Sequence, residues 1–261
     1  MTDWMITIPR KTKYDRFNKI MLLIHDRDIH KWIIGAETGS GGYDHWQIRM
    51  KTRCDDNQLG FAEEKAWWTA YGFPEAHIEP CSDKYAYETK EGKYIASWDT
   101  MEQRAVRFGK MKWYQECIVK DTYRTNDREV RVWVDPEGNS GKSWTVAHLV
   151  ETGEAYYVPP IFNSAEGMLK WLCDLVKQDR DRGYPPRPLI LIDIPRTWRW
   201  KPEHYVTIEM IKDGLLCDPR YGSTLLSVRG CKVLVMTNEK PKLDKLSADR
   251  WKFSYSPVFK D

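Results

Sequence analysis

The first hundred residues alternate between two hydrophobic periods, and this alternation predicts short strands and short helices. Apolar side chains at helical spacing from Phe17 to Ile24 predict a helix over residues 14–25, and residues 62–71 and 84–89 are also predicted to be helical. Strands are predicted for the extended or alternating segments 4–8, 31–38, 45–51 and 77–79. Together these elements predict an α+β domain over residues 1–100, an antiparallel sheet with flanking helices.

The second half of the chain has a different pattern. Residues 189–194 and 232–236 are continuous apolar runs, which are typical of strands buried on both faces of a parallel sheet. A strand is predicted at 130–134, and helices at 142–151 and 165–177. Residues 129–261 are therefore predicted to form an α/β domain. Residues 101–128 are polar, basic and aromatic, and are predicted to be a linker or oligomerisation segment with a helix.

Composition adds little about partners but excludes some classes. The 261 residues carry a net charge of only +3, so any nucleic-acid site must come from local clustering. The six cysteines form no Cys-x-x-Cys pair and no signal peptide precedes them, which favours reduced thiols in an intracellular protein. The apolar runs are too short to span a bilayer, so no membrane association is expected.

A phosphate-binding loop is predicted where the strand at 130–134 meets the following helix. Backbone N–H groups of a glycine turn at a helix start surround a phosphate, and the lysine and hydroxyl that follow contact the phosphates and Mg²⁺. The segment that would bind ATP in this way consists of Gly138, Asn139, Ser140, Gly141, Lys142 and Ser143. The loop is shortened, because Pro136 stands where the usual spacing requires glycine. The alternative is a glycine turn without a ligand.

Polar residues end two of the buried strands in the same half. Asp193 ends the apolar run 189–194 and would hold Mg²⁺ together with Ser143, whereas the alternative is a turn cap. Asn238 follows the run 232–236 and would sense the γ-phosphate and orient water, unless it is a turn residue before a proline. No second acid follows Asp193, so the base that activates water stays open between Glu137 and Glu151.

A metal site is predicted in the first half. Period-2 alternation puts His45 and Gln47 on one open face of their strand, opposite apolar neighbours that pack on the core. Glu37 ends the preceding strand across a glycine turn and could add a carboxylate. A mixed nitrogen and oxygen set suits Mg²⁺ or Mn²⁺ better than zinc. The alternative is a set of ordinary surface residues.

Tyr87 and Lys90 complete the candidate chemistry of this half. Residues at i and i+3 of a helix share a face, so the lysine could position a phosphodiester that the tyrosine oxygen attacks to form a covalent phosphotyrosine. Tyr85 is the nearest competitor as nucleophile, but its spacing to Lys90 does not fit a helix. A solvated helix face is the alternative.

In this order, the motifs resemble those of the replication initiators (Rep) of eukaryote-type circular single-stranded DNA viruses (CRESS-DNA). The resemblance rests on Met-Ile-Thr-Ile-Pro at 5–9, Gly-Ala-Glu at 35–37 with His-Trp-Gln at 45–47, Tyr-Glu-Thr-Lys at 87–90, the loop at 138–143, Asp-Ile-Pro-Arg at 193–196 and Met-Thr-Asn at 236–238. Gln47 replaces the second histidine, as in this viral group. The Asp-Ile-Pro-Arg form and the short linker look closer to smacovirus and nanovirus initiators.

The resemblance implies an HUH endonuclease domain followed by a superfamily 3, AAA+-like helicase ATPase. Such a protein would nick and rejoin single-stranded DNA at an origin stem-loop, use ATP and Mg²⁺ or Mn²⁺, assemble as a hexameric ring and work with the host replication machinery. Arg250 would reach the ATP of a neighbouring subunit, and Lys212 and Arg220 would contact the DNA backbone. The protein would act inside the infected cell, in the nucleus if the host is eukaryotic.

Two other functions fit the same residues. One is an ATP-dependent DNA translocase without nicking activity, whose first half only binds DNA. The other is a nucleotide-binding and DNA-binding protein that does not turn ATP over.

Overall fold

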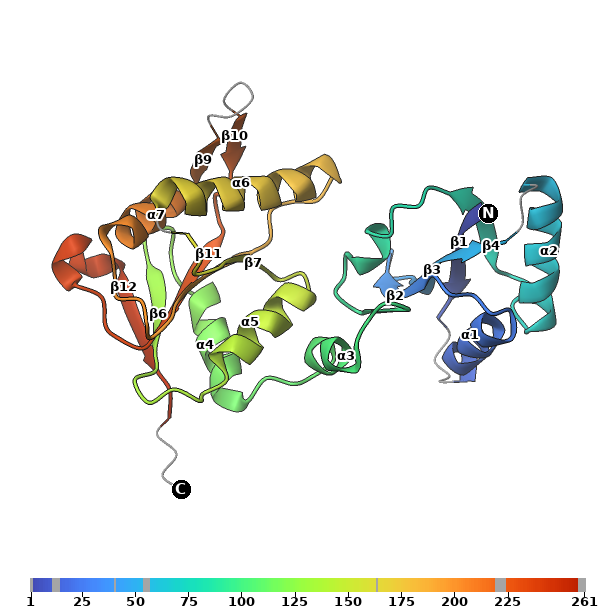
Figure 1. Cartoon of the computed structure of the whole chain (residues 1–261), viewed down its shortest axis with the longest axis horizontal. Helices are drawn as coiled ribbons and strands as arrows, with labels where there is room; N and C mark the ends of the chain where they lie inside the picture. Colours follow the sequence, from blue (N-terminus) through green and yellow to red (C-terminus); the bar gives the residue numbers. More distant parts are fainter. Residues whose placement is uncertain are drawn as a thin grey trace. The chain divides into compact units, whose positions relative to one another are not determined.

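The computed structural model describes residues 2–10, 15–39, 41–53, 57–162, 164–218 and 224–257. They form two compact units, Met1–Phe108 and Gly109–Asp261. Figure 1 shows the two units and the order of their elements. Each unit is described below by itself.

The first unit is built on an antiparallel sheet with strand order β4-β1-β3-β2-β5. Its strands are β1 (Thr2–Pro9), β2 (Trp32–Thr38), β3 (Asp44–Thr52), β4 (His77–Cys81) and β5 (Tyr94–Ala96). Its helices are α1 (Asp15–Asp26), α2 (Asn57–Ala70), the 3₁₀ turn η1 (Tyr87–Thr89) and α3 (Met101–Arg107). The predicted antiparallel sheet with helices is confirmed.

One face of this sheet carries the core of the unit. Alternate residues of β1 and β3, among them Ile6 and Ile48, pack against the apolar stripe of α1 and against Trp68 of α2. Because both helices contribute to this one cluster, they cover the same face of the sheet (Figure 1). The opposite face is therefore left for the polar residues of β2 and β3.

The polar face of β2 and β3 is less exposed to solvent than the alternation of polar residues predicts. Gln47 and Arg49 are buried, so the expectation of an open face on β3 is wrong beyond His45. The backbone of η1 packs against β2, and Arg49 donates a 2.8 Å hydrogen bond to Glu88 of this turn. The helix expected at 84–89 is also shortened to the single turn η1. A segment far along the chain thus covers the strand face that carries the candidate metal ligands.

The second unit contains a five-stranded parallel sheet with strand order β12-β6-β11-β8-β7. Its strands are β6 (Val130–Val134), β7 (Ala155–Val158), β8 (Leu189–Ile194), β11 (Lys232–Thr237) and β12 (Trp251–Tyr255). Its helices are α4 (Trp113–Tyr123), α5 (Lys142–Glu151), α6 (Ala165–Asp181), α7 (Pro202–Asp213) and the short turns η2 (Leu243–Lys245) and η3 (Ala248–Arg250). A hairpin of β9 (Leu215–Asp218) and β10 (Thr224–Ser227) follows α7.

Helices cover both faces of the parallel sheet, which explains why its strands read as continuous apolar runs. Even-numbered residues of β8, such as Ile190 and Ile192, pack with α6 and α7. Odd-numbered residues, such as Leu189 and Leu191, pack with α4 and α5. In Figure 1 the two pairs of helices lie on opposite sides of the strands. The predicted parallel α/β half is confirmed, although β7, α7 and β12 were not foreseen.

The segment 101–128 contains two helices where the sequence indicated one. Of these, α3 is part of the first unit and α4 of the second. Tyr114 and Ile118 of α4 are buried in the cluster between the parallel sheet and α5. Part of the expected linker is therefore core of the second unit.

Replacing Gly35 with alanine should destabilise the first unit. A Cβ at this position would lie 2.5 Å from the backbone oxygen of Glu88, so η1 would have to move away from β2. We expect Gly35→Ala to lower the free energy of unfolding by about 1–3 kcal/mol in urea titrations. Gly41→Ala is the matched control, because no atom lies within 4 Å of its added Cβ. Equal stability of the two variants would contradict the close approach.

Candidate functional sites

The phosphate loop connects β6 to α5 through an unusual backbone. Gly138, Asn139 and Gly141 have positive φ angles of 84°, 60° and 78°. Consecutive residues in this region turn successive N–H groups toward one concave side, which suits an anion. Gly141 immediately precedes Lys142, the first residue of α5, so the positive end of the helix dipole points at the same place.

The loop is held from outside by side chains that sequence reasoning missed. Tyr114 and Gln115 of α4 donate hydrogen bonds of 2.7 and 3.0 Å to the backbone oxygen of Ser140. A Cβ at Gly141 would lie 2.7 Å from Nε2 of Gln115, so glycine is required there for this contact as well. These contacts join residues about 25 positions apart, and no local pattern in the sequence signals them.

A second brace comes from the segment after β8. Arg196 donates hydrogen bonds of 2.7 and 3.0 Å to the backbone oxygens of Pro136 and Glu137. This arginine ends the Asp-Ile-Pro-Arg motif, and its contact with the loop joins residues about 60 positions apart. The tip of the shortened loop is therefore tied to the strand end that carries Asp193.

Asp135 fills part of the loop from within. Its buried carboxylate accepts hydrogen bonds from Nζ of Lys142 at 2.8 Å, from Oγ of Ser140 at 2.6 Å and from the N–H of Gly138 at 3.2 Å. Burial raises the pKa of Asp135, but the contacts with Lys142 and Ser140 outweigh burial and hold it below its usual range. The carboxylate is thus charged and paired with the lysine that was predicted to bind phosphate.

The sheet brings Asp193 and Asn238 to the same region. The odd positions of β8 and the even positions of β11 face α5, and both residues continue these series. Because β11 lies between β6 and β8, Asn238 is adjacent to the loop, and its side chain donates a hydrogen bond to the backbone oxygen of Asp135. Burial raises the pKa of Asp193, and the charge of Lys142 opposes this shift.

The predicted Mg²⁺ ligand Ser143 and the two candidate bases lie at different distances from the loop. Ser143 is exposed in the first turn of α5, next to Lys142. Glu137 is exposed at the loop tip. Glu151 is the last residue of α5 and lies about 13 Å along the helix from the loop, which disfavours it as the water-activating base.

In the first unit, Glu37 is the centre of the candidate cluster. Its carboxylate is 1% exposed, and neither oxygen accepts a hydrogen bond of good geometry. Nζ of Lys90 lies 2.6 Å from Oε2 of Glu37, and Nε2 of His45 lies 3.4 Å from the same oxygen. Burial lowers the pKa of Lys90, but Glu37 outweighs burial and raises it above the usual value.

Tyr87 joins this cluster through Lys90. The ammonium lies 3.8 Å from the centre of the tyrosine ring, because side chains at i and i+3 of a 3₁₀ turn eclipse each other. Tyr87 is 44% exposed, so its side chain is accessible from solvent. The structure therefore brings Glu37, His45, Tyr87 and Lys90 together.

The competing Tyr85 has a different environment. Its hydroxyl donates a 2.5 Å hydrogen bond to Asp3, and its ring packs edge-on against Trp98. Burial, followed by the contact with Asp3, raises its pKa far above the usual value. These contacts give Tyr85 a structural role.

The donor set of the first unit fits a divalent cation in its chemistry. Among the residues that the structure describes, no three His, Cys, Asp or Glu side chains form a metal cluster. The third donor would be the amide oxygen of Gln47, which accepts a 3.0 Å hydrogen bond from Thr7. Glu37 pairs with His45 across β2 and β3, and Gly35 pairs with Gln47, so the three donors come from neighbouring strands. The buried carboxylate of Glu37, whose oxygens accept no hydrogen bond of good geometry although Lys90 lies beside one of them, is the observation that favours a cation there.

A pocket of about 420 Å³ in the second unit contains Lys212 and Arg250. It also contains Lys232, which starts β11, so it lies at the amino ends of the parallel strands, opposite the phosphate loop. Lys212 donates to the backbone oxygen of Asn126, and Arg250 lies 4.0 Å from Glu209. Arg220, the other predicted DNA contact, lies outside the described residues.

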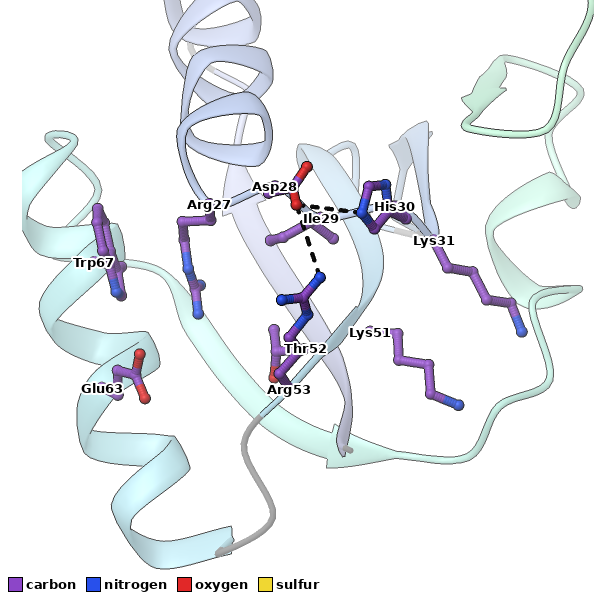
Figure 2. A pocket seen from close by; sticks show the side chains of 10 residues that line it. All are labelled: Arg27, Asp28, Ile29, His30, Lys31, Lys51, Thr52, Arg53, Glu63 and Trp67. Carbon is purple, nitrogen blue, oxygen red and sulfur yellow. Dashed lines mark ion pairs between the residues drawn. The ribbon is translucent and has the colours of Figure 1, made fainter.

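Figure 2 shows another pocket, of about 570 Å³, which lies where β2 begins and β3 ends. Glu37 and His45 lie at the other end of these two strands. Basic residues of this pocket face acidic partners: Arg27 forms two 2.6 Å hydrogen bonds with Glu64, and Arg53 lies 3.8 Å from Asp28. Figure 2 shows Asp28 between Arg53 and His30. Lys51 also lies 3.8 Å from Asp3, so three of the four Lys and Arg side chains of this pocket already have an acidic partner, and we assign no ligand to it.

Comparison with curated proteins finds distant relatives. The master replication protein of Faba bean necrotic yellows virus is 26% identical over 194 residues, which cover 70% of this chain and 59% of that protein. The master replication protein of Subterranean clover stunt virus is 26% identical over 188 residues, covering 68% and 57%. That of Banana bunchy top virus is 31% identical over 124 residues, covering 46% and 37%. The chain thus spans less than two thirds of the length of each of these relatives.

The chain is therefore distantly homologous to nanovirus master replication proteins, the Rep proteins of circular single-stranded DNA viruses, and the resemblance seen in the motifs is confirmed. No protein-family model matches the chain. A solved formyltetrahydrofolate deformylase from Pseudomonas putida KT2440 aligns at 8% identity with a TM-score of 0.21, which is too low to support an inference. No helix in the described part of the chain is long and apolar enough to cross a membrane.

Lys212 should titrate close to neutral pH. Burial lowers its pKa to about 8, and the nearby charges of Lys232 and Arg250 act in the same direction. The unfolded chain keeps this proton up to about pH 10.5, so folding releases a proton between pH 8 and 10.5, and the stability of the fold rises with pH in this window. Lys212→Met should abolish this rise in unfolding experiments at pH 8 and 10.

The pKa itself is measurable by NMR titration of the lysine side chains, with Lys212→Met as the assignment control. We expect Arg250→Met to raise the pKa of Lys212, because a neighbouring positive charge is removed. A pKa near 10.5 in the intact protein would contradict the clustered arrangement.

Proposed function

We propose that this protein initiates rolling-circle DNA replication. Its first unit nicks and rejoins single-stranded DNA at an origin stem-loop, and its second unit is an ATP-driven helicase. The homology to master replication proteins supports the class of function. The cluster of Tyr87, Lys90, Glu37 and His45 is the observation that carries the nicking activity, because it combines an exposed nucleophile with a cation and a candidate metal site.

The proposed cleavage is a transesterification. Oη of Tyr87 attacks a DNA phosphorus, a new bond joins tyrosine to the 5′ phosphate, and the bond to the 3′ oxygen breaks. The phenolic proton is lost to solvent and the leaving 3′ oxygen takes up a proton, so the strand ends in a free 3′-OH that primes synthesis. Rejoining reverses the same steps. Lys90, beside the tyrosine ring, neutralises the phosphate under attack.

Glu37, His45 and Gln47 would hold Mg²⁺ or Mn²⁺, which supplies polarisation of the phosphoryl group. Within the protein, Glu37 also anchors Lys90 through their 2.6 Å contact. The same carboxylate thereby fixes the position of the cationic side chain relative to Tyr87. An HUH endonuclease with one histidine replaced by Gln47 is consistent with these donors.

The second unit is proposed to hydrolyse ATP at the loop of residues 138–143. Lys142 contacts the phosphates, Ser143 and Asp193 hold Mg²⁺, and Asn238 orients the attacking water. The proximity of Asn238 and Asp193 to the loop, on the α5 side of the sheet, supports these roles.

Assembly into a hexameric ring is part of the proposal. Arg250 faces a pocket away from the phosphate loop of its own unit, across the length of β6, about 17 Å. Its side chain is 12% exposed beside Glu209, so it would have to turn outward to reach a neighbouring subunit's ATP, as a head-to-tail ring requires. DNA-backbone contacts by Lys212 and Arg220, cooperation with host replication proteins and nuclear location in a eukaryotic host also belong to this proposal.

Tyr87→Phe should abolish DNA cleavage. We expect a loss of about 10³-fold or more, because no other oxygen in the cluster replaces the phenol. The assay uses a pool of single-stranded oligonucleotides with variable stem-loops and Mn²⁺, and detects the 5′-phosphotyrosine adduct by mass spectrometry.

Tyr85→Phe is the matched control, since it removes the neighbouring phenol that is bound to Asp3. It should retain cleavage. Nicking by Tyr87→Phe would overturn the assigned nucleophile, and absence of any adduct with the unaltered protein would favour a translocase without nicking activity.

ATP hydrolysis should depend on Lys142, the predicted phosphate ligand, and on Asn238, which is predicted to orient the attacking water. Lys142→Ala should lower ATP hydrolysis about 100-fold or more, and Asn238→Ala should lower it while leaving nucleotide affinity nearly unchanged. Rates are measured with and without single-stranded DNA. Equal rates for Lys142→Ala and the unaltered protein would remove the ATPase assignment and leave a nucleotide-binding protein without turnover.

A further inference from the structure

We propose that Asp135 is an internal competitor for the phosphates of the nucleotide, an inference that rests on the proposed nucleotide site. Its carboxylate is bound by the loop in the way that a phosphate oxygen would be. The nucleotide must therefore displace the carboxylate from Lys142 before that lysine can bind a phosphate. Asp135 would set the affinity of the loop for ATP and ADP.

The hydrogen-bond donors to the Asp135 carboxylate are the same groups that would bind a phosphate. Lys142, the hydroxyl of Ser140 and the N–H of Gly138 all point to its two oxygens. These are a loop lysine, a loop hydroxyl and a loop N–H group, the donor types that phosphate loops offer to an anion. No exposed face of the carboxylate remains, since the residue is only 1% exposed.

Electrostatic repulsion prevents the Asp135 carboxylate and a nucleotide phosphate from binding Lys142 at the same time. A carboxylate 2.8 Å from Nζ of Lys142 neutralises this lysine in the free protein. A phosphate on the same lysine would bring further negative charge close to Asp135, in a partly buried region where like charges repel strongly. The described contacts of Asp135 include no other lysine or arginine that could compensate for the second anion.

The backbone of the loop has other supports besides this carboxylate, which binds the backbone only at the N–H of Gly138. Tyr114 and Gln115 hold the backbone at Ser140, and Arg196 holds the tip. Asn238 binds the backbone oxygen of Asp135, not its side chain. A change of the Asp135 side chain should therefore alter the charge in the loop without releasing its backbone.

The test compares the binding of ADP and of inorganic pyrophosphate by isothermal titration calorimetry, with the full chain. Asp135→Asn keeps one oxygen acceptor, which can serve the N–H of Gly138, but removes the negative charge that is paired with Lys142. We expect it to bind both ligands about tenfold or more tightly than the unaltered protein. Pyrophosphate should show the effect as clearly as ADP, because the competition concerns phosphate.

Glu239→Gln is the matched control. It removes the same charge from an exposed side chain that directly follows Asn238, so it should change the affinity about twofold or less. A gain with Glu239→Gln equal to that with Asp135→Asn would overturn the proposal, because the effect would then be general electrostatics.

Asp135→Ala distinguishes a carboxylate that competes with phosphate from one that only supports the loop. Competition predicts binding at least as tight as in the unaltered protein, whereas a carboxylate that only braces the loop predicts weaker binding. Unchanged affinity with slower ATP hydrolysis in Asp135→Asn would assign a catalytic role and overturn competition.

Thermal unfolding of the same variants checks that each is folded and gives a second readout. The shift of the unfolding temperature on adding ADP should be larger for Asp135→Asn than for the unaltered protein. If neither protein binds ADP or pyrophosphate, the proposed nucleotide site itself fails. If the unaltered protein binds both and Asp135→Asn binds no more tightly, only the competitor fails.

Discussion

A buried charge paired with an internal counter-ion stands at the centre of each unit's candidate site. Glu37 is almost fully buried and lies against Lys90, and Lys142 lies against the buried Asp135. An isolated ion in such surroundings is strongly unfavourable, so each must have a partner in the free protein. The partner carries the charge sign of the expected ligand: an ammonium where a metal ion would bind, and a carboxylate where a phosphate would bind. Under the proposed competition, Asp135 and the nucleotide exclude each other at Lys142, whereas Glu37 has a second oxygen and can contact Lys90 and a cation together.

The parallel sheet determines how the second site is assembled. Because β11 separates β6 from β8, the residue that follows β11 meets the phosphate loop directly, while Asp193 approaches from one strand farther away. The period-2 alternation then turns both residues toward α5. The loop would still lack support without α4 and Arg196, whose hydrogen bonds fix its backbone. The strand order thus places Asp193 and Asn238 near the loop, and hydrogen bonds from side chains distant in sequence fix the backbone of the loop.

The strands and the phosphate loop were predictable because their signals are local. The buried runs at β8 and β11 have continuous apolar residues, and a glycine turn followed by lysine marks the loop. The covering of β3 by η1 was not predictable, since the contact of Arg49 with Glu88 joins residues 39 positions apart. The same holds for Lys212, because the two charges that lower its pKa, Lys232 of β11 and Arg250 of η3, come from other segments of the chain. Sequence periodicity identifies which face of a strand a residue occupies, but not whether another segment covers that face and buries the residue.

The geometry of η1 shows how the nucleophile comes to depend on tertiary contacts. A regular α-helix at 84–89 would have fixed Tyr87 and Lys90 by its own hydrogen bonds, whereas a single 3₁₀ turn has little stability of its own. The turn is held by the Arg49–Glu88 pair and by its close approach to Gly35. Both contacts come from the strands that carry Glu37 and Gln47. The position of Tyr87 is therefore coupled to the sheet that supplies the candidate metal ligands, so any movement of one part displaces the other.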